Sequence, residues 1–320
     1  MIELKQKENL LVIVGPTAVG KTAVSIDVAK KLNGEIISAD SMQIYKYMDI
    51  GTAKIKPEEM EGIPHYLIDI VYPDEDFTVA DFKHHAEKYI KKINAVNKVP
   101  IVVGGSGLYL NSIVYELKFT KIKKNEEFRK KCQELANIHG VEYLYNRLNH
   151  IDPLTASRIS PNDIKRIIRA LEVYDETGKP MSYFNKDFRE KTDKYNLLMI
   201  GLTTDRATLY SRIEERVDKM IEEGLIEEVQ NLLNMGYGRD LVSMQAIGYK
   251  EIISYLYGET SLQEAIDILK RNTRRFAKRQ LTWFKRDDRI KWIDIGKFNS
   301  IDEISNYIVN NFNNMLINQF

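Results

Sequence analysis

The sequence predicts an α/β protein with a parallel β-sheet flanked by helices and with a helical insertion in the middle of the chain. Short apolar runs alternate with amphipathic helical segments from residue 1 to 114 and again from 197 to 320. Apolar strands that alternate with helices are typical of a parallel sheet covered on both faces. Between residues 115 and 196 charged helical segments with proline breaks replace the strands. We therefore expect a core of residues 1–114 and 197–320 and a helical insertion domain of residues 115–196.

The first expected strand is Leu10–Val14, and a glycine-rich loop follows it directly. Residues 15–22 read Gly-Pro-Thr-Ala-Val-Gly-Lys-Thr, which matches the P-loop pattern G-x-x-x-x-G-K-[ST], and a helical pattern begins immediately afterwards. In such a loop, backbone N–H groups, a helix N-terminus and the lysine surround phosphate oxygens, and the last hydroxyl binds Mg²⁺. The segment predicts a P-loop NTPase-like core that binds a polyphosphate through Lys21, with Thr22 as a Mg²⁺ ligand.

The rest of the core is expected to alternate in the same way. Further strands are predicted at residues 35–38, 66–70, 100–103, 197–202 and 291–294. Thr78 is expected to cap a helix that runs to about Asn97, because Asp81 follows three residues later. Later helices are predicted at residues 206–223, 225–235, 244–257, 261–286 and 301–317.

The charge of the chain is unevenly distributed. The 320 residues carry a net charge of only +1, yet residues 270–286 contain eight lysines and arginines and no acid, and residues 118–131 form a second basic stretch. A local excess of positive charge favours a nucleic-acid partner. No apolar run is long enough to span a membrane, and the single cysteine, Cys132, fits a reducing compartment. We therefore expect a cytoplasmic protein without a membrane segment.

Asp40 lies where the second expected strand ends. Open α/β sheets bind their ligands at the carboxyl ends of the strands, so this carboxylate is expected close to the P-loop. There it could act as a general base or as an outer ligand of Mg²⁺. The alternative is an N-cap or loop aspartate without a chemical role, which position alone favours.

Several blocks of the chain resemble the tRNA dimethylallyltransferase family, and they follow one another in the order found in that family. Beyond the P-loop they are Asp-Ser-Met-Gln-Ile-Tyr at 40–45, Met-Asp-Ile-Gly-Thr-Ala-Lys at 48–54, Gly-Gly-Ser-Gly-Leu-Tyr at 104–109, Met-Gln-Ala-Ile-Gly-Tyr-Lys-Glu at 244–251 and Lys-Arg-Gln-Leu-Thr-Trp-Phe-Lys at 278–285. Many enzymes share a P-loop, whereas this ordered set is highly specific. The blocks span most of the chain.

The resemblance implies transfer of a dimethylallyl group from dimethylallyl diphosphate to N6 of the adenosine immediately 3′ of the anticodon. In the family, the residue matching Asp40 is the base that takes the N6 proton, the one matching Ser106 lies beside the reacting groups, and the one matching Arg216 contacts the diphosphate. From spacing alone, Arg216 would more readily belong to a solvated basic stripe. The implied diphosphate ligands are Gly15, Thr17, Ala18, Gly20, Lys21 and Thr22, with Mg²⁺ at Thr22.

Contact with the anticodon arm of tRNA is expected from several segments. In the helix at 261–286, cations form two neighbouring stripes with an aromatic residue among them, a pattern typical of phosphate and base contact. The resemblance implies that three further segments contact tRNA: a basic segment of the insertion, the start of the block at 40–45 and the block at 244–251. The tRNA-binding candidates are Asp40, Ser41, Met42, Gln43, Lys165, Arg166, Arg169, Gln245, Gly248, Tyr249, Arg275, Lys278, Arg279 and Trp283.

The chain departs from the family pattern in two places. Lys46-Tyr47 stands where many members have Arg-Gly, and the zinc finger of eukaryotic members is absent, which indicates a bacterial-type enzyme. A P-loop small-molecule or nucleotide kinase is the alternative, for which Asp69 could supply the acid. A GTP-dependent RNA-binding switch fits less well, because no Asn-Lys-x-Asp motif occurs. We expect a monomer.

Overall fold

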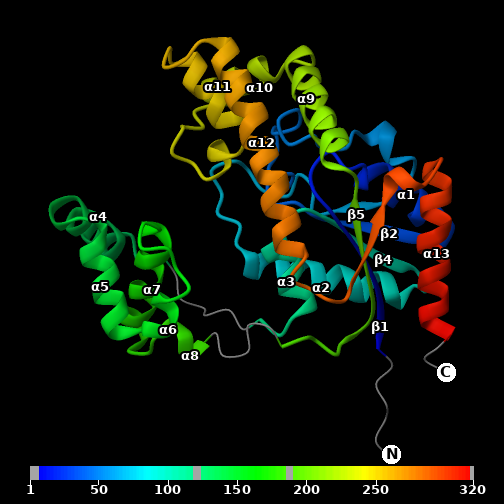
Figure 1. Cartoon of the computed structure of the whole chain (residues 1–320), viewed down its shortest axis with the longest axis horizontal. Helices are drawn as coiled ribbons and strands as arrows, with labels where there is room; N and C mark the ends of the chain where they lie inside the picture. Colours follow the sequence, from blue (N-terminus) through cyan, green and yellow to red (C-terminus); the bar gives the residue numbers. More distant parts are fainter. Residues whose placement is uncertain (1–6, 118–123, 185–189, 318–320) are drawn as a thin grey trace, which may run out of the picture. The chain divides into compact units, whose positions relative to one another are not determined.

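The computed structural model describes residues 7–117, 124–184 and 190–317. The chain divides into two compact units (Figure 1). Met1–Ile113 together with Asp193–Phe320 form the sheet unit, and Val114–Thr192 form the helical unit. The sequence-based expectation set the insertion at 115–196.

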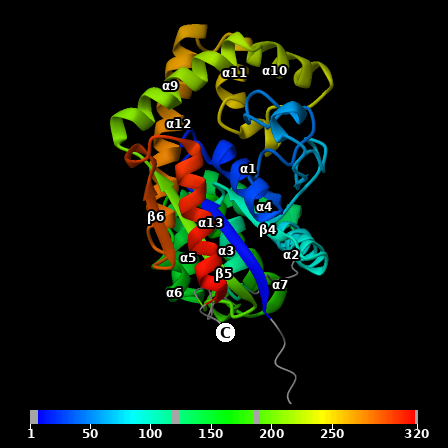
Figure 2. The ribbon, with the colours of Figure 1, turned by 90° about the vertical axis from the view of Figure 1, so that its right-hand side faces the viewer.

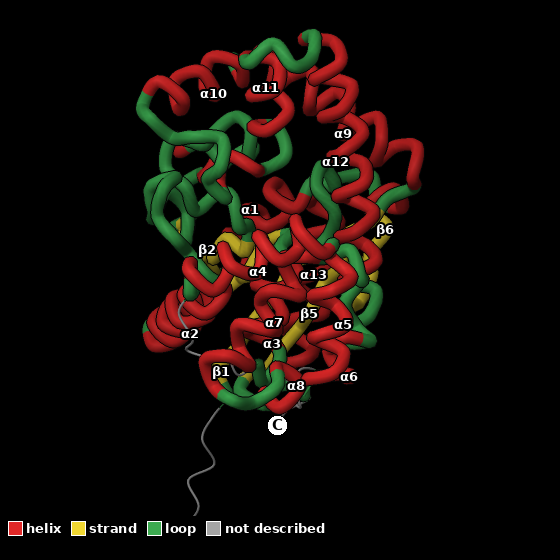
Figure 3. Tube along the Cα trace, turned by 90° about the vertical axis from the view of Figure 1, so that its left-hand side faces the viewer, coloured by secondary structure: helices red, strands yellow, loops and turns green. Residues whose placement is uncertain are grey.

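Among the described residues, six parallel strands form a single sheet. In spatial order they are β3 (His65–Tyr66), β2 (Gly34–Ala39), β4 (Val99–Gly104), β1 (Glu8–Val14), β5 (Tyr195–Thr203) and β6 (Ile290–Asp294). Each neighbouring pair is parallel. Figure 3 shows that helices surround the strands of the sheet unit. The predicted fold class, a parallel sheet flanked by helices, is therefore confirmed.

Helices connect the strands and cover the sheet. α1 (Lys21–Leu32) and α13 (Ile301–Ile317) pack against each other along the sheet (Figure 2), while α2 (Val79–Ala95) contacts β1, β2 and β4. The expected N-cap of α2 is present, because the side chain of Thr78 accepts the N–H of Asp81. The other helices outside the helical unit are α3 (Gly107–Val114), α9 (Arg206–Glu222), α10 (Leu225–Asn234), α11 (Tyr249–Leu256) and α12 (Leu262–Phe284).

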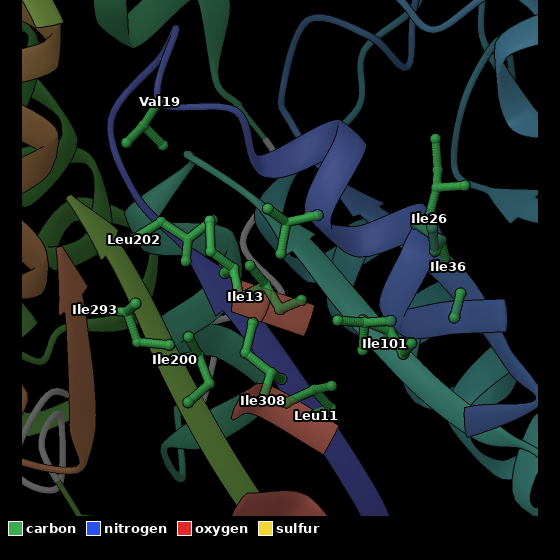
Figure 4. Close-up of a cluster of buried hydrophobic side chains, with 14 of the residues drawn as sticks. Leu11, Ile13, Val19, Ile26, Ile36, Ile101, Ile200, Leu202, Ile293 and Ile308 are labelled. Atoms are coloured by element: carbon green, nitrogen blue, oxygen red, sulfur yellow. The ribbon is translucent and has the colours of Figure 1, made fainter. Parts of the chain in front are cut away.

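The main core lies between the sheet and the helices α1 and α13. Alternate positions of the central strands supply its side chains, among them Leu11 and Ile13 of β1 and Ile200 of β5, and Ile308 of α13 meets them (Figure 4). All four residues are completely buried. Every residue of the segment Leu10–Val14 is buried, as expected for a central strand that is covered on both faces.

The register of the sheet brings three strand ends to one edge. Val14 pairs with Gly104, and Gly104 pairs with Ala39. A β-carbon at Gly104 would lie 2.2 Å from the carbonyl oxygen of Ala39, so this close approach requires glycine. The loops that follow β1, β2 and β4 therefore leave the sheet next to one another, at the edge where α/β proteins bind ligands.

The strand expected at residues 66–70 is wrong in length. β3 contains only His65 and Tyr66, because Leu67 and Asp69 adopt positive φ angles of 64° and 55° that interrupt extended backbone. The chain turns there, and a residue further on, at position 71, makes an isolated parallel bridge with Tyr45. The segment after β3 is therefore tied to the loop that follows β2.

The helix expected at residues 244–257 begins later than predicted. Ser243–Gln245 form one 3₁₀ turn, and α11 starts only at Tyr249. Gly248, directly before α11, has a φ of 103°, which no right-handed helix allows. Apolar periodicity continues through the break, so the pattern alone did not reveal it.

The helical unit has a core of its own. Its elements are α4 (Glu126–His139), α5 (Val141–Ile151), α6 (Pro153–Ala156), α7 (Ile164–Thr177) and α8 (Met181–Phe184). Apolar side chains such as Leu148 and Ile167 form the centre of this unit. Glu172 is also fully buried there, and its carboxylate accepts hydrogen bonds from the guanidinium groups of Arg129 and Arg169.

Two features noted in the composition can be located in the structure. Of the second basic stretch, residues 118–123 lie outside the described residues, and the remainder leads into α4. The single cysteine, Cys132, is a buried free thiol in α4. Within the described part of the chain, every helix is too short or too polar to cross a membrane.

Candidate active site

The loop after β1 has the backbone of a phosphate-binding loop. A β-carbon at Gly15 would lie 2.6 Å from the carbonyl oxygen of Leu202, so the loop passes this point only as glycine. Ala18 and Gly20 adopt φ angles of 64° and 94°, and α1 begins at Lys21. Left-handed residues before a helix N-terminus turn successive N–H groups toward a common point, where an anion can bind.

Lys21 folds its side chain over this loop. Its ammonium group donates to the carbonyl oxygens of Gly15 (3.0 Å) and Pro16 (2.8 Å). Burial and the positive charge of Arg216 lower the pKa of Lys21 to about 7, and the negative charge of Asp40 opposes this fall. A bound polyanion would favour the protonated form of the lysine.

Arg216 reaches the same loop from α9. Its Nη1 lies 3.5 Å from Oγ1 of Thr17, and burial lowers the pKa of its guanidinium group, again opposed by the charge of Asp40. The sequence places Arg216 in a basic stripe with Arg212 and Lys219, four residues before and three residues after it. Arg212 is exposed, and the ammonium of Lys219 lies 3.7 Å from the carboxylate of Glu223. Arg216 is therefore the member of the stripe that lies at the P-loop.

The loops after β2 and β4 are joined by serine side chains. Oδ1 of Asp40 accepts the N–H of Met42 (2.9 Å), which turns the chain after β2. Oγ of Ser106 accepts the N–H of Ser41 (2.9 Å) and donates to its Oγ (3.2 Å). The N–H of Ser106 donates to the carbonyl oxygen of Ala39 (3.1 Å). Ser106 thus fixes the backbone on both sides of Asp40.

A cavity of about 150 Å³ lies between the P-loop, Asp40 and Arg216, and Gly15 and Ser106 are not among the residues that line it. The sequence-predicted residues that line it are Thr17, Ala18, Gly20, Lys21, Thr22, Asp40, Gln43 and Arg216. Its apolar wall is formed by Ile36, Ile55, Ile68, Val103 and Phe276. A polar end with phosphate-binding groups next to an apolar wall suits an amphipathic ligand that carries phosphate.

Thr22 and Asp40 bring two oxygen groups to this cavity. Such donors fit Mg²⁺, which retains waters and binds substrate phosphates in preference to an all-protein cage. In the part of the chain that is described, no group of three or more His, Cys, Asp or Glu residues could hold a metal ion. A Mg²⁺ ion at this site would therefore depend on oxygens of the bound phosphate.

Gln280 of α12 is a site residue that the sequence reasoning missed. Its Oε1 accepts the N–H of Thr17 (2.8 Å), and its Nε2 donates to the carbonyl oxygen of Gly105 (3.1 Å). A β-carbon at Gly105 would lie 2.1 Å from Nε2, so this glycine makes room for the amide. One buried side chain thus joins the P-loop to the loop after β4. Its spacing four residues from Phe276 and Phe284, on the inward face of α12, was the available signal.

The opposite face of α12 carries the predicted cations. The exposed ones are Arg271, Arg275, Lys278, Arg279, Lys285 and Arg286. Arg274 and Lys270 instead form ion pairs with Glu214 and Asp218 of α9. Trp283 is partly buried, because its ring packs on the backbone at the start of α3. The contact is so close that a β-carbon at position 107, which is glycine, would lie 2.3 Å from the ring.

A second set of missed residues fixes the turn Asp49–Gly51. The carboxylate of Glu228, in α10, accepts the N–H groups of all three residues at 2.7–3.1 Å and the hydroxyl of Tyr249 at 2.6 Å. Tyr249 was predicted to touch tRNA, but it has no exposed surface. Gly248 is buried beside the same turn, whereas Gln245 is exposed.

Gln43 supports the next part of this segment. Its Nε2 donates to the carbonyl oxygens of Thr52 (3.3 Å) and Ala53 (3.2 Å), and its Oε1 accepts from Oγ of Ser38 (3.2 Å). The amide therefore links β2 to the loop that lines the far side of the cavity. Gln43, which we predicted to contact tRNA, lines the cavity, and its polar atoms hold that wall.

The cations predicted in the insertion lie on α7 of the helical unit. Lys165 and Arg166 are exposed, and Nε of Arg166 lies 3.4 Å from the carboxylate of Asp163. Arg169 is ion-paired with the buried Glu172. The three predicted cations of α7 therefore differ in exposure and in their ion pairs with acidic residues.

The chain is similar in sequence to known transferases. A family model described as IPP transferase matches residues 43–287. The tRNA dimethylallyltransferase of Thermoanaerobacter sp. (strain X514) is 55% identical over 303 residues, which cover 94% of this chain and 96% of that protein. The enzyme of the same name from Carboxydothermus hydrogenoformans is 56% identical over 310 residues, covering 95% of this chain and 99% of that protein.

Solved structures are similar as well. The full-length tRNA isopentenylpyrophosphate transferase of Bacillus halodurans is 48% identical with a TM-score of 0.73, and the match covers 98% of this chain and 99% of that chain. A eukaryotic dimethylallyltransferase acting on tRNA is 30% identical with a TM-score of 0.79, covering 95% of this chain and 80% of that chain. The similarity therefore extends over both the sheet unit and the helical unit.

Proposed function

Since the chain belongs to the IPP transferase family of tRNA dimethylallyltransferases, we propose that it moves a dimethylallyl group from dimethylallyl diphosphate to N6 of the adenosine immediately 3′ of the anticodon. The main structural observation in support of this reaction is that Asp40, Lys21 and Arg216 line the same cavity. A carboxylate that can take a proton thus faces two cations that can hold an anionic leaving group. This arrangement fits prenyl transfer better than the kinase alternative.

The diphosphate is assigned to the P-loop. When the bond between the allylic carbon and oxygen breaks, its electron pair moves to the diphosphate, and negative charge grows there. Backbone N–H groups of the loop after Thr17, the ammonium of Lys21 and the guanidinium of Arg216 stabilise that charge. Their burial strengthens the effect, because a low local dielectric weakens screening. Mg²⁺ held by Thr22 and phosphate oxygens would neutralise further charge on the leaving group.

Asp40 is assigned to the acceptor amine. An exocyclic amine of adenine is a weak nucleophile, and a carboxylate that takes its proton as nitrogen bonds to carbon lowers the barrier. Ser106 holds the backbone around Asp40, so the carboxylate stays in one position. The apolar wall with Ile36 and Phe276 suits the dimethylallyl group and excludes water, which would otherwise compete as a nucleophile.

The tRNA backbone is assigned to the exposed cations of α12, chiefly Arg275, Lys278 and Arg279. Lys165 and Arg166 of α7 are further candidates in the helical unit. We reassign Tyr249 from tRNA contact to support of the turn Asp49–Gly51, because it is buried against it. We further propose that the protein acts as a monomer in the cytoplasm.

A transfer assay tests the reaction. The protein is mixed with unmodified tRNA, Mg²⁺ and either dimethylallyl diphosphate labelled in the prenyl group or ATP labelled in the γ-phosphate. Label is expected in tRNA only from the prenyl donor, with release of diphosphate. Phosphoryl transfer or nucleotide hydrolysis in its place would favour the kinase and overturn the proposal.

The variant Asp40→Asn tests the assigned base. It should bind tRNA normally and lower the rate constant for prenyl transfer by at least about a hundredfold, since general bases contribute roughly 10²–10⁴-fold. Asp302→Asn removes the same charge from α13 and should be fully active. A rate for Asp40→Asn close to that of the wild type would remove the carboxylate from the mechanism.

A further inference from the structure

Two exposed tyrosines form an aromatic surface beside the active-site loops. Tyr47 and Tyr72 lie with their ring centroids 5.9 Å apart, and 44% and 40% of their surfaces are exposed. The ammonium of Lys46 lies 4.0 Å from the centre of the Tyr72 ring. We call these three residues the Tyr47–Tyr72 surface. It combines two aromatic faces with one cation, the groups that proteins use to stack unpaired bases.

Backbone hydrogen bonds hold the two tyrosines in fixed relative positions. The N–H of Lys46 donates to the carbonyl oxygen of Val71 (2.9 Å), and the N–H of Val71 donates to that of Ile44 (3.1 Å). Tyr45 and Val71 form an isolated parallel bridge. Tyr47 and Tyr72 therefore project from two paired segments, and little conformational entropy would be lost when a ligand binds them.

The backbone at Tyr47 is strained, and packing does not explain why an aromatic residue stands there. Its φ is 66°, in the left-handed region that bulky side chains avoid. Glycine adopts this conformation without strain, whereas tyrosine does so only at an energetic cost. The side chain is exposed, so it adds little to the core. A strained, exposed aromatic residue next to an active site points to a binding role.

The Tyr47–Tyr72 surface continues the segment that carries the general base. Asp40 and Gln43 line the cavity, and the chain from them to Tyr47 is pinned at Tyr45. The surface therefore lies on the same pinned segment as two residues that line the cavity. The carboxylate of Glu75 accepts the N–H of Tyr72 (2.5 Å), and its negative charge disfavours a phosphate at this place. An uncharged, flat group fits better.

We propose that the Tyr47–Tyr72 surface stacks an unpaired anticodon-loop base that neighbours the acceptor adenosine. This inference rests on the proposed function, because it needs tRNA as the substrate. The stack holds the anticodon loop while the acceptor base is turned into the cavity. It replaces the stacking that the neighbouring base loses when the acceptor base leaves the loop.

The variant Tyr47→Gly separates binding from folding. It removes one aromatic face and the backbone strain together, so the affinity for an unmodified anticodon stem-loop should fall by roughly 5- to 100-fold, the range for loss of one base–aromatic stack. The melting temperature should stay equal or rise by about 2–4 °C. Tyr307→Ala, which removes a 45% exposed tyrosine from α13, is the matched control and should change neither affinity nor activity.

Ionic strength distinguishes this contact from phosphate contacts. The loss of affinity in Tyr47→Gly should be the same at low and high salt, because no charge is removed. Tyr72→Ala should show a similar loss, and Tyr47→Phe should bind as the wild type does. A fluorescent adenine analogue placed next to the acceptor position should be quenched on binding to the wild type and not to Tyr47→Gly.

Three results would overturn the proposal. Unchanged affinity in Tyr47→Gly would show that no base stacks there, and a large fall in melting temperature would show that Tyr47 is a packing residue. A change in sedimentation of the free protein with unaltered RNA affinity would indicate self-association through this surface. In every case the prenyl-transfer activity of the wild type is measured in parallel. If the wild type does not modify tRNA, the proposed function itself is refuted.

Discussion

The helices α12 and α7 look alike in sequence and differ in structure. Both carry clusters of lysine and arginine that we predicted to meet tRNA. On α12, Arg275 and Arg279 are exposed on a face that has no acidic residue from position 270 to 286. On α7, Arg169 is bound to Glu172, whose carboxylate is buried in the helical unit. One cluster is open to a partner, whereas the other is partly committed to its own core.

The two helices differ in the acidic residues near their cations. A cation that is ion-paired with an acid is less available to a ligand. Glu172 follows Arg169 by three residues, the spacing that places both on one helix face. The first cations of α12 also meet acids, but these come from α9, as with Arg274 and Glu214. Counting cations therefore overestimates an RNA-binding surface unless every neighbouring helix is considered.

The largest expected effect concerns the structural role of α7. Glu172→Gln would leave the guanidinium groups of Arg129 and Arg169 without their carboxylate, and it should destabilise the protein by about 2 kcal/mol or more. Asp175→Asn removes an exposed charge from the same helix and should change stability by less than about 0.5 kcal/mol. Chemical denaturation of the whole chain measures both. Equal stabilities of the two variants would show that the buried pair has no structural role.

Acid sensitivity gives an independent measure of the same pair. Burial by itself would raise the pKa of Glu172, but hydrogen bonds from Arg129, the N–H of Asn125 and Arg169 outweigh it and lower the pKa to about 2. A lowered pKa in the folded state adds stability that is complete above pH 4.5 and is lost as the pH falls toward 2. Glu172→Gln should lose less stability than the wild type between these pH values.

The second effect concerns the open face of α12. Replacing Arg275 and Arg279 together by alanine should weaken tRNA binding and reduce the slope of log Kd against log salt concentration by about 1.5, as expected for two lost phosphate contacts. Lys88→Ala with Lys91→Ala removes the same charge from exposed positions of α2 and should leave the slope nearly unchanged. If both double variants alter the slope equally, only net charge matters and α12 has no special role.

Features that depend on neighbouring residues in the chain could be predicted from the sequence. The P-loop pattern predicted a helix directly after the loop, where α1 begins, and apolar runs predicted the central strands. Asp40 could be placed because the carboxyl ends of parallel strands share one edge. The strand at 66–70 failed for a local reason, since nothing in its apolar pattern marks a positive φ at Leu67.

Contacts between distant segments could not be predicted in this way. Gln280 lies 263 residues from Thr17, whose N–H it binds; its spacing from Phe276 and Phe284 indicates an inward side chain but not which groups the side chain meets. Glu228 lies 178 residues from Ile50 and reads as one more acid on an amphipathic helix. Only packing brings these side chains to the site, so their roles follow from tertiary structure alone.

A third effect concerns Lys21, the partly buried cation of the P-loop. The pKa of Lys21 is about 7 in the free protein, so most of this lysine is neutral at pH 8. Binding of inorganic diphosphate should draw in close to one proton at pH 8, and the affinity should fall by up to about tenfold per pH unit above 7. Calorimetry in buffers of different ionisation enthalpy measures this uptake. Lys21→Arg stays protonated and should take up about one proton fewer; equal uptake would assign the proton to another group.

The smallest effect decides how much of α7 is left for RNA. Lys165 is exposed at the start of this helix, two residues after its N-cap Asp163, and it is not part of the Glu172 cluster. If it contacts one phosphate, Lys165→Ala should weaken tRNA binding by about two- to fivefold, reduce the salt slope by about 0.7–0.9 and leave the melting temperature unchanged. Arg169→Ala should lower the melting temperature as well, because it removes a partner of the buried carboxylate. Identical behaviour of the two variants would contradict the division of α7 into a free and a committed cation.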